Sequence, residues 1–516
     1  MTRPQAALLR QATIRDAINQ SRQYRARRGT HGKAKSVALA ASSGESAVRW
    51  LAMTLLASLL LMVHWGEARA TEIQRVISDA GIEAWLVEDN TVPIIAMDFS
   101  FAGGSTQDPS GKAGTAAMLS SLLDEGAGDM DSQAFQTALE ENAIKLSFDA
   151  GRDRFYGSLR TLTPNRQLAF DLLAKALQKP LFDAEPIERM RAQWIVSAKQ
   201  ELTDPDSIAA RALREAAFGD HPYGIAPEGS QESLAAITRD DILAMHKNIF
   251  TRQGLKIGVV GAIDAESLKA MLDAVFAPLP ASGTLLPVED LDLTKTGEFH
   301  VDFATPQTKI NFAMPGIDRH DEDFYAAYIV NHILGGGSFS SRLYNEIREK
   351  RGLAYGVYSY LADYDHVQIL AGGMATRTDN TDQALLLVKQ EIHRLGNEGP
   401  SEEELASAKK YLIGSYPLRF DSSSKISRQL VGIQEEDLGI DYFDKRNSYM
   451  EKVTLEDAKR AAKRLLDPSK LLIVTVGQQI KHASAEPQKS GKAAPALAKA
   501  VAPANDNDAK RKVRAN

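Results

Sequence analysis

The sequence predicts an α+β protein built from two similar halves. Three kinds of segment occur in both halves in the same order: an alternating apolar strand, a later helix, and a closing apolar strand that ends on glycine. In the first half these are residues 94–101, 239–250 and 255–261, and in the second half residues 308–314, 455–466 and 471–477. Three matched elements in one order indicate a duplicated unit in which each sheet packs helices on a face.

A break rich in proline and glycine begins at Pro278 and separates the two halves. The end of the chain is rich in Ala, Pro, Lys and Asn without hydrophobic periodicity, which is typical of a disordered tail. The predicted organisation is a basic segment with a signal peptide or anchor at 1–70, an N-terminal domain at 71–279, a linker at 280–298, a C-terminal domain at 299–479 and a tail at 480–516.

The first 70 residues have the pattern of a targeting segment. Arg49 precedes an uncharged apolar run at 50–63, and Ala68-Arg69-Ala70 then supplies an A-x-A cleavage pattern. The run is shorter than the roughly 20 residues of a comfortable membrane span. We therefore expect cleavage after Ala70 and export, with a periplasmic location. Because the basic stretch is long for a signal peptide, a later start or an uncleaved anchor at 50–63 stays open.

Charge and cysteine content narrow the possible functions. The first 70 residues carry a formal charge of +8 and residues 480–516 carry +5. Because the whole chain has a net charge of −6, the segment between them carries −19. Such an acidic body argues against a nucleic-acid partner and mildly favours basic or neutral ligands, although solubility alone also explains it. The absence of cysteine excludes disulfides, thiolate metal sites and a cysteine nucleophile.

A strand, a glycine-containing loop and a short helix follow one another at residues 101–123. The helix reads Gly-Thr-Ala-Ala-Met-Leu-Ser-Ser-Leu-Leu from Gly114. This order resembles the pitrilysin family of zinc peptidases, which includes insulin-degrading enzyme and the mitochondrial processing peptidase. Active members carry an inverted zinc motif here, with two His ligands and a Glu that activates water. On this resemblance, Ala117 and Ser121 occupy the His positions and Ser120 the Glu position, so the motif is lost.

The third zinc ligand of the family is a Glu on a later helix. The phrases at 182–185 and 188–191 resemble the lead-in to that helix, and the family's spacing then falls on Ser197. If the register slips, Glu188 and Glu201 are the nearest spare carboxylates, but one carboxylate without His partners holds Zn²⁺ poorly. We therefore expect no metal ligand set in this chain.

The histidines do not supply a replacement site. No two of them stand at i, i+4 spacing, and no His-x-x-Glu-His occurs, although a ligand pair from separate elements stays possible. Capping or surface roles are the default for all ten, which are His31, His64, His221, His246, His300, His320, His332, His366, His393 and His482.

The second half carries the more informative motif, at residues 334–358. It reads as a Gly-rich loop, a Ser N-cap, a helix of three turns that buries Leu343 and Ile347, a C-cap at Gly352, and a strand. The motif closely resembles the C-domain signature of the same family. The resemblance spans about residues 73–479 and implies two homologous α+β sandwich-like domains that form a clamshell, with one lobe from each half.

In the family, an Arg and a Tyr of this motif reach the zinc site of a facing domain and help to hold the oxyanion. The matching residues are Arg348 and Tyr355, with Arg351 and Tyr358 as a competing pair at the same spacing. A guanidinium fork and a phenol both donate hydrogen bonds to oxygen, as this role requires. A structural role, with an Arg closing a helix and a half-buried strand Tyr, is the alternative. The glycine segment is expected to bind substrate through Gly335, Gly336, Gly337 and Ser338.

Together, the lost zinc motif and the retained Arg/Tyr motif predict a non-catalytic subunit of a heterodimeric zinc peptidase. Zinc is expected in the partner subunit and no cofactor in this chain, and the mature chain is expected to lack a stable membrane span. The substrate would be an extended peptide that adds a strand to a sheet edge, for which residues 99–104 or the partner's equivalent are candidates. A peptide-binding or assembly subunit without a role in hydrolysis is the alternative, and autonomous peptidase activity would need an unrecognised metal site.

Overall fold

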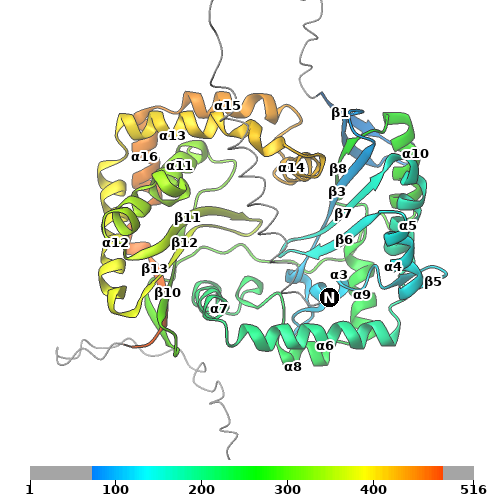
Figure 1. Cartoon of the computed structure of the whole chain (residues 1–516), viewed down its shortest axis with the longest axis horizontal. Coiled ribbons are helices and arrows are strands. Elements are labelled where there is room, and N and C mark those ends of the chain that lie inside the picture. Colours follow the sequence, from blue (N-terminus) through cyan, green and yellow to red (C-terminus); the bar gives the residue numbers. More distant parts are fainter. Residues whose placement is uncertain (1–71, 480–516) are drawn as a thin grey trace, which may run out of the picture. The chain divides into compact units, whose positions relative to one another are not determined.

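The computed structural model describes residues 72–479, which fold as two α+β lobes, one from each half of the sequence (Figure 1). The expected basic segment, the apolar run at 50–63, the cleavage site after Ala70 and the tail at 480–516 all lie outside the described residues. No helix in the described part is both long enough and apolar enough to cross a membrane.

The N-terminal half consists of a six-stranded sheet, a short two-stranded ribbon and the helices around them. The sheet strands are β1 Ile73–Ile77, β2 Glu83–Glu88, β3 Ile94–Ala102, β6 Lys145–Ala150, β7 Arg154–Leu162 and β8 Lys256–Gly261, and the ribbon is β4 Gly126–Ala127 with β5 Met130–Asp131. The helices are α3 Thr115–Ser120, α4 Ser132–Glu141, α5 Arg166–Gln178, α6 Ala184–Glu201, α7 Pro205–Phe218, α8 Gln231–Ala236, α9 Arg239–Ile249 and α10 Ala265–Phe276.

The C-terminal half has a five-stranded sheet. Its strands are β9 Gly297–Asp302, β10 Gln307–Pro315, β11 Ala354–Tyr364, β12 Val367–Arg377 and β13 Leu472–Gly477. Its α-helices are α11 Phe324–Asn331, α12 Thr381–Glu398, α13 Glu402–Gly414, α14 Ser423–Glu435, α15 Tyr442–Lys452 and α16 Leu455–Leu465, and wider π-type turns run over His332–Gly336 and Tyr344–Glu349.

The strand order confirms the duplication. The N-half sheet runs β1-β2-β8-β3-β7-β6, and the C-half sheet, taken from its other edge, runs β9-β13-β10-β12-β11. From β2 and β9 onward the two orders match strand for strand. In each sheet the first of these matched pairs is parallel and the remaining pairs are antiparallel. The predicted strands at 94–101 and 308–314 are β3 and β10, which lie at the centres of their sheets.

The predicted helix before each closing strand is also confirmed, and the two helices begin in the same way. Helix α9 has Thr238 as its N-cap, and Thr238 and Asp241 form a capping box. Helix α16 repeats this arrangement with Thr454 and Asp457. Each Thr accepts a backbone N–H of the first turn and each Asp accepts the N–H of its Thr, which satisfies donors that a helix start leaves free.

The strands that precede β3 and β10 were not predicted. Strand β9 is solvent-exposed along nearly its whole length, so it lacks the apolar pattern by which a buried strand is found. It begins at Gly297, inside the segment expected to be the linker at 280–298. Strand β9 therefore begins two residues before residue 299, where the C-terminal domain was expected to start.

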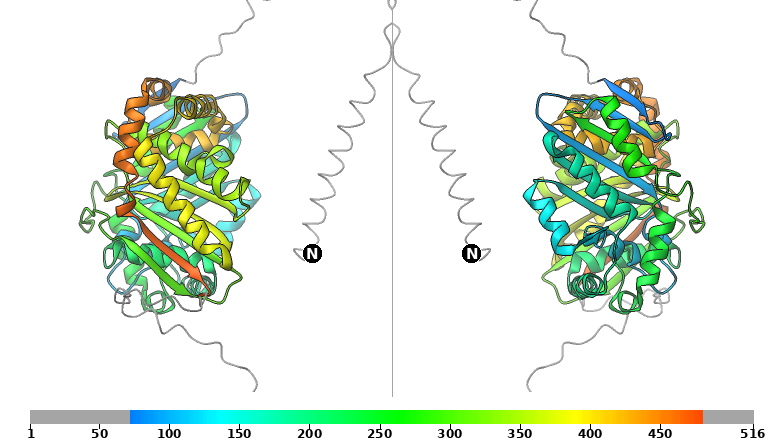
Figure 2. Two further views of the ribbon diagram at one scale, coloured as in Figure 1. Left: turned by 90° about the vertical axis from the view of Figure 1, so that its left-hand side faces the viewer. Right: turned by 90° about the vertical axis from the view of Figure 1, so that its right-hand side faces the viewer.

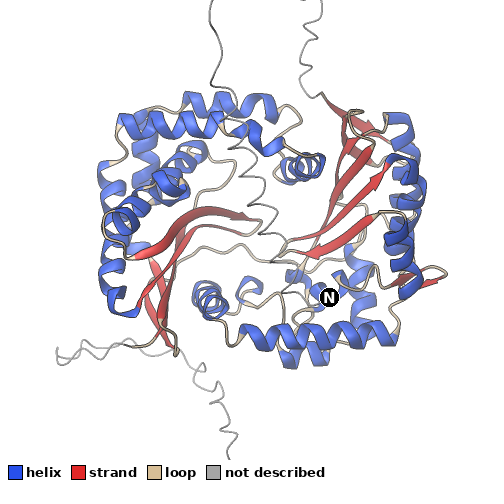
Figure 3. Cartoon of the chain, viewed as in Figure 1, coloured by secondary structure: helices blue, strands red, loops and turns tan. Residues whose placement is uncertain are grey.

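Helices cover each sheet on the side away from the other half (Figures 2 and 3). In the N half this layer buries the largest apolar cluster, in which the rings of Phe99, Phe101 and Phe276 make edge-to-face or tilted contacts. A second cluster between the C-half sheet and its helices includes Leu343 and Ile347, both fully buried as the motif predicted.

On its other face, each sheet is covered in part by a helix of the opposite half. Helix α14 packs on β8 and β3, and helix α7 packs on β13 and β10. The approach of α14 is close, because a Cβ at Gly258 would lie 2.4 Å from the backbone oxygen of Ser427. The Ser427 hydroxyl donates to buried Asp98, and Gln434 Nε2 donates to the Ile257 carbonyl at 2.9 Å. The two halves are therefore interlocked.

The hairpin turns β6–β7 and β11–β12 also meet. Arg154 pairs with Asp365 at 3.1 Å, and the Tyr223 hydroxyl donates to Asp153 at 2.7 Å. The same hydroxyl accepts the backbone N–H of His366 at 3.1 Å. Tyr223 thus links a turn of each half.

The expectation that residues 99–104 form an open sheet edge is wrong. Strand β3 is hydrogen-bonded to β7 on one side and to β8 on the other, so it cannot accept a further strand. In the described structure the edge strands are β1 and β6 in the N half and β9 and β11 in the C half. An apolar run such as 94–101 is typical of a central strand, and edge strands are usually more polar.

Candidate active site

The strand, loop and helix at residues 101–120 keep their fold without zinc residues. The Asp108 carboxylate accepts the backbone N–H groups of Gly114 at 2.7 Å and Ala116 at 2.8 Å, which ties the loop to the start of α3. Gly114 has φ of +93°, a conformation that favours glycine. Burial raises the pKa of Asp108 to about 7, against the opposing effect of the two hydrogen bonds.

The three positions that correspond to the zinc motif are occupied by small side chains, and the two serine hydroxyls among them donate hydrogen bonds to backbone carbonyls of their own helix. Ala117 is buried, the Ser120 hydroxyl donates to the Ala117 carbonyl at 2.8 Å, and the Ser121 hydroxyl donates to the Met118 carbonyl at 2.9 Å. Hydroxyls that bond back to the preceding turn offer nothing that could hold a metal or activate water.

Helix α6 approaches Ser121 with a residue that sequence reasoning missed. The indole Nε1 of Trp194 donates to the Ser121 hydroxyl at 3.2 Å. Ser197, the expected third ligand position, is exposed, whereas the next residue, Ala198, is buried. The face of α6 that points toward Ser121 therefore carries the aromatic ring of Trp194. Apolar positions at 187, 190, 194 and 198 follow helical spacing and indicate this buried face in the sequence.

The spare carboxylates and the histidines have other partners. Glu188 pairs with Arg191 at 3.2 Å, and Glu201 lies 3.9 Å from Arg211. His246 Nε2 contacts the Leu177 carbonyl at 2.9 Å, and burial lowers its pKa to about 4. His332 stacks on Tyr411. Across residues 72–479, no group of three or more His, Asp or Glu side chains is placed to hold a metal ion.

In the C half, the structure brings Arg348 and Tyr355 together. The Arg348 guanidinium lies over the Tyr355 ring, 4.8 Å from its centroid, and over the Tyr344 ring at 4.9 Å. Tyr344 is buried, and Phe339 packs edge-on against it at 5.1 Å. Tyr355 is 87% exposed. The guanidinium is therefore held between a fixed ring and a ring that faces solvent, with cation–π attraction on both sides.

The local backbone explains this placement. The Ser341 hydroxyl accepts the Tyr344 N–H at 3.4 Å at the start of this segment, which then runs as a wider π-type turn over Tyr344–Glu349 in place of the predicted helix of three turns. At the other end Gly352 has φ of +60°, and its N–H donates to the Arg348 carbonyl at 2.9 Å. The register of β11 against β12 then shifts between Ala354 and Val357, which takes Tyr355 out of the regular ladder.

The competing pair is not brought together in this way. Arg351 Nη1 donates to the Glu346 carboxylate and to the Glu346 carbonyl, both at 2.7 Å. Tyr358 stacks instead on Tyr360, with 6.2 Å between ring centroids. Each residue of this pair thus has a local partner, and Arg348 with Tyr355 remains the better candidate.

The glycine segment is packed directly against β11. A Cβ at Gly335 would lie 2.5 Å from the Ser359 hydroxyl, one at Gly336 would lie 2.9 Å from Asn331 Nδ2, and one at Gly337 would lie 2.7 Å from the His332 carbonyl. Ser338 follows with φ of +48°. Close backbone approach thus accounts for these glycines, and it places the segment beside the strand that carries Tyr355.

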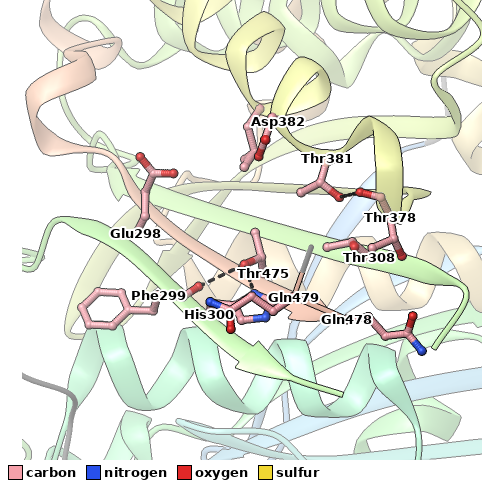
Figure 4. Close-up of a pocket in the computed structure, with 11 residues that line it drawn as sticks. Glu298, Phe299, His300, Thr308, Thr378, Thr381, Asp382, Thr475, Gln478 and Gln479 are labelled. Carbon is pink, nitrogen blue, oxygen red and sulfur yellow. Dashed lines mark hydrogen bonds between the residues drawn. The ribbon is translucent and has the colours of Figure 1, made fainter. Parts of the chain in front are cut away.

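A separate small pocket of about 240 Å³ lies between β9, β13 and the start of α12 (Figure 4). Some of its polar groups are bonded to one another. His300 Nδ1 contacts the Thr475 hydroxyl at 2.9 Å, and the Thr381 hydroxyl donates to the Thr378 carbonyl at 2.9 Å. It contains none of the expected site residues.

Comparison with known proteins agrees with this architecture. Residues 85–229 match the family model described as insulinase (peptidase family M16), and residues 236–412 match the one described as the peptidase M16 inactive domain. A Helicobacter pylori protein named non-peptidase homolog YmxG is 27% identical over 72% of this chain and 85% of its own length. A Bacillus subtilis protein named uncharacterized zinc protease YmxG is 24% identical over 69% of this chain and 87% of its own length.

Among solved structures, the chain is similar to a peptidase M16 inactive domain from Pseudomonas fluorescens. The TM-score is 0.75 and the identity 29%, over 80% of this chain and all of the other. The first family model lies within the N half, and the second begins at α9 near the end of the N half and runs into the C half. The chain is therefore a member of the M16, or pitrilysin-like, peptidase family that lacks the family's zinc motif.

Proposed function

We propose that this chain is a non-catalytic subunit of a heterodimeric zinc peptidase, in which a related partner supplies the zinc and this chain supplies Arg348 and Tyr355. The observation that carries the proposal is the contrast between the two candidate sites. Ala117, Ser120 and Ser121 provide no ligand, whereas Arg348 is held under a Tyr355 that is 87% exposed. The Helicobacter pylori relative named as a non-peptidase supports an inactive N half.

The chemistry assigned to this pair is stabilisation of the oxyanion that forms when water attacks a peptide carbonyl. A guanidinium stays charged at all physiological pH values, and its planar fork donates in a fixed direction. The phenol of Tyr355 supplies a second donor. One donor of this kind lowers the barrier by roughly 3–4 kcal/mol when it is placed in advance of the reaction.

The substrate in this proposal is an extended peptide. The segment Gly335, Gly336, Gly337 and Ser338 lies beside the strand that carries Tyr355, and Gly336 and Ser338 are its exposed members, at which a peptide could make contact. Strands β6 and β11 stand at the edges of their sheets, and in this proposal the peptide is added as a further strand at one of these edges.

The test uses the chain alone and together with a co-expressed relative that carries an intact zinc motif. Alone, we expect no stoichiometric zinc and no cleavage of a peptide library. With the partner, we expect a one-to-one complex that cleaves peptides and loses activity on chelation. Zinc bound to the chain alone, removed together with its activity by chelator, contradicts the proposal. A stable complex without added activity supports the alternative role of an assembly or peptide-binding subunit.

We also propose that the mature chain works outside the cytoplasm, because the apolar run at 50–63 precedes the Ala68-Arg69-Ala70 pattern. Amino-terminal sequencing of protein from its native host checks this. We expect a start near Thr71 in the exported fraction. A cytoplasmic product that still begins before Met53 contradicts export, and an exported product that keeps residues 50–63 indicates an anchor.

A further inference from the structure

Strand β11 contains an irregularity at the residue on which the proposed function depends. Ala354 pairs with Thr376 of β12, and Val357 pairs with Met374, so three steps along β11 correspond to two steps along β12. One extra residue is therefore inserted in β11 between Ala354 and Val357, and Tyr355 lies in this insertion. Such an insertion is a β-bulge, which bends the strand locally and redirects its side chains.

The burial pattern of β11 shows what the bulge achieves. Side chains of a regular strand alternate between the two faces of the sheet. In β11, Ala354 and Val357 are buried, whereas Tyr355 and Gly356 between them are both exposed. Alternation then resumes, and Ser359 is again buried. Without the extra residue, Ala354 and Val357 would fall on opposite faces. The bulge therefore keeps both in the core while Tyr355 faces solvent.

Thr376 fixes the start of this bulge from the neighbouring strand. Its hydroxyl donates to the Leu353 carbonyl at 2.6 Å. The Leu353 N–H donates to the Ile347 carbonyl at 2.9 Å, so both backbone groups of Leu353 are bonded. Thr376 and Leu353 are 2% and 8% exposed. A buried carbonyl that loses its donor is costly, so the hydroxyl of Thr376 holds Leu353 in place against β12.

The segment that Thr376 fixes also connects the two members of the Arg/Tyr pair. The Gly352 N–H donates to the Arg348 carbonyl at 2.9 Å. Leu353 follows Gly352, and Tyr355 comes two residues later. The distance of 4.8 Å between the Arg348 guanidinium and the centroid of the Tyr355 ring therefore depends on where this segment lies against the sheet. The bond from Thr376 supplies a fixed point just before the ring.

We propose that Thr376 is a positioning residue for the Arg/Tyr pair: its hydroxyl holds the start of the bulge, so that Tyr355 stays over the Arg348 guanidinium. The catalytic consequence rests on the proposed function, whereas the placement of Tyr355 is a property of this chain alone. Thr376 acts through Tyr355 and is assigned no contact with substrate. A displacement of about 1 Å at a catalytic group can lower a rate by about 100-fold, so a second residue that prevents such a displacement matters for turnover.

The first experiment measures the placement of Tyr355 in the isolated full chain, without partner or zinc. Fluorotyrosine is incorporated at position 355, and its fluorine NMR resonance is recorded. Thr376→Val keeps the shape of the side chain but lacks the hydroxyl, and it should shift or broaden the resonance, as Arg348→Ala should. Thr376→Ala is a second variant without the hydroxyl and should act in the same way. Thr376→Ser keeps the hydroxyl and should leave the resonance unchanged.

The matched control is Thr308→Val. Thr308 lies opposite Thr376 on β10 and is also 2% exposed. Its hydroxyl has no hydrogen-bond partner among the described residues, so this substitution removes a buried hydroxyl from the same sheet without freeing the Leu353 carbonyl. The fluorine resonance should stay unchanged. Equal changes in Thr308→Val and Thr376→Val, or an unchanged resonance in Thr376→Val, overturn the proposal.

The second experiment measures kinetics of the complex with a zinc-bearing partner. Thr376→Val should lower kcat by about tenfold with little change in KM, and Thr376→Ser should keep most of the rate. In a chain that already carries Tyr355→Phe, Thr376→Val should have no further effect, because it acts through the missing phenol. A further tenfold loss in that background contradicts positioning through Tyr355. An inactive complex contradicts the proposed function, and the fluorine measurement then decides the positioning role by itself.

Discussion

The segments between the central and edge strands hold matching places in the two halves, from β3 to β6 in one and from β10 to β11 in the other. In the N half this segment carries α3, whose serines bond their own helix and accept Trp194. In the C half it carries Arg348, which is held between two tyrosines, one of them open to solvent. One copy of the fold has become internal structure, while the other presents charged and hydrogen-bonding groups outward. This difference is the reason why the proposed function assigns its site to the C half.

The largest expected effect is a loss of peptidase activity when Arg348 or Tyr355 is changed, compared with a change at Ser121 in the N half. In a complex with a zinc-bearing partner, Tyr355→Phe and Arg348→Ala should each lower kcat by roughly 10²–10³, the range for loss of one oxyanion donor. Arg348→Ala is also expected to raise KM. Steady-state kinetics on the purified complex measures both. Ser121→Ala, in the N half, is the control and should leave kcat unchanged.

Full activity of an assembled double variant of Arg348 and Tyr355 would contradict an active-site role for this pair. The assembly state is checked by size-exclusion chromatography, because Arg348→Ala also removes the packing of its aliphatic stem.

The next effect concerns stability of the N half. Trp194→Ala should lower the free energy of unfolding by about 2 kcal/mol, less than for a fully buried tryptophan, because the ring is only partly buried. Val196→Ala is the control on the same helix, since Val196 is 53% exposed, and it should change stability by less than about 0.5 kcal/mol. Denaturant titration compares them. Equal losses of stability in the two variants would mean that the packing of Trp194 beside Ser121 does not stabilise the fold.

The third effect is a pH dependence at Asp108. Its folded pKa of about 7 exceeds the unfolded value of 3.8, so the folded state retains its proton longer. Between about pH 4 and 7 the unfolded state therefore binds fewer protons, and the free energy of unfolding should fall as pH rises. The slope from one group is at most about 1.4 kcal/mol per pH unit. Asp108→Asn should flatten this slope, and an unchanged slope in that variant would exclude Asp108 as its source.

The smallest effect tests the ring beneath Arg348. Tyr344→Leu should lower kcat of the complex by about fivefold, since one cation–π contact contributes about 0.5–1 kcal/mol. Tyr344→Phe keeps the ring and should keep the rate. Tyr360→Leu, on the neighbouring strand, serves as the control for loss of an aromatic ring. A rate loss in Tyr344→Phe equal to that in Tyr344→Leu would point to the hydroxyl instead of the ring.

Much of the fold could be predicted because buried strands and capped helices leave regular patterns. Strands β3, β8, β10 and β13 carry runs of apolar residues and lie inside their sheets, and the Thr–Asp capping boxes mark the starts of α9 and α16. Exposed β9 has no such pattern and was missed. The error about residues 99–104 has the same origin, because a single apolar run does not reveal how many neighbours a strand has.

The candidate site could be predicted in part. The motif at 334–358 located the helical segment between Ser341 and Gly352, because caps and spacing are local, and the role of Arg348 and Tyr355 stays a prediction. Contacts between distant segments could not be predicted in this way. Trp194 reaches Ser121 from a separate helix, and Thr376 reaches Leu353 from the neighbouring strand.

The crossing of α14 has a consequence for how the chain acquires its fold. The Ser427–Asp98 hydrogen bond joins residues 329 positions apart, so α14 cannot cover the N-half sheet until the chain has been synthesised beyond Glu435. Contacts of such sequence separation form slowly, because a long loop must close first. During synthesis one face of the first sheet, including Trp85 and Val260, stays open to water and to chaperones. The first lobe therefore reaches its final, covered state only after helix α14 of the second half has been synthesised.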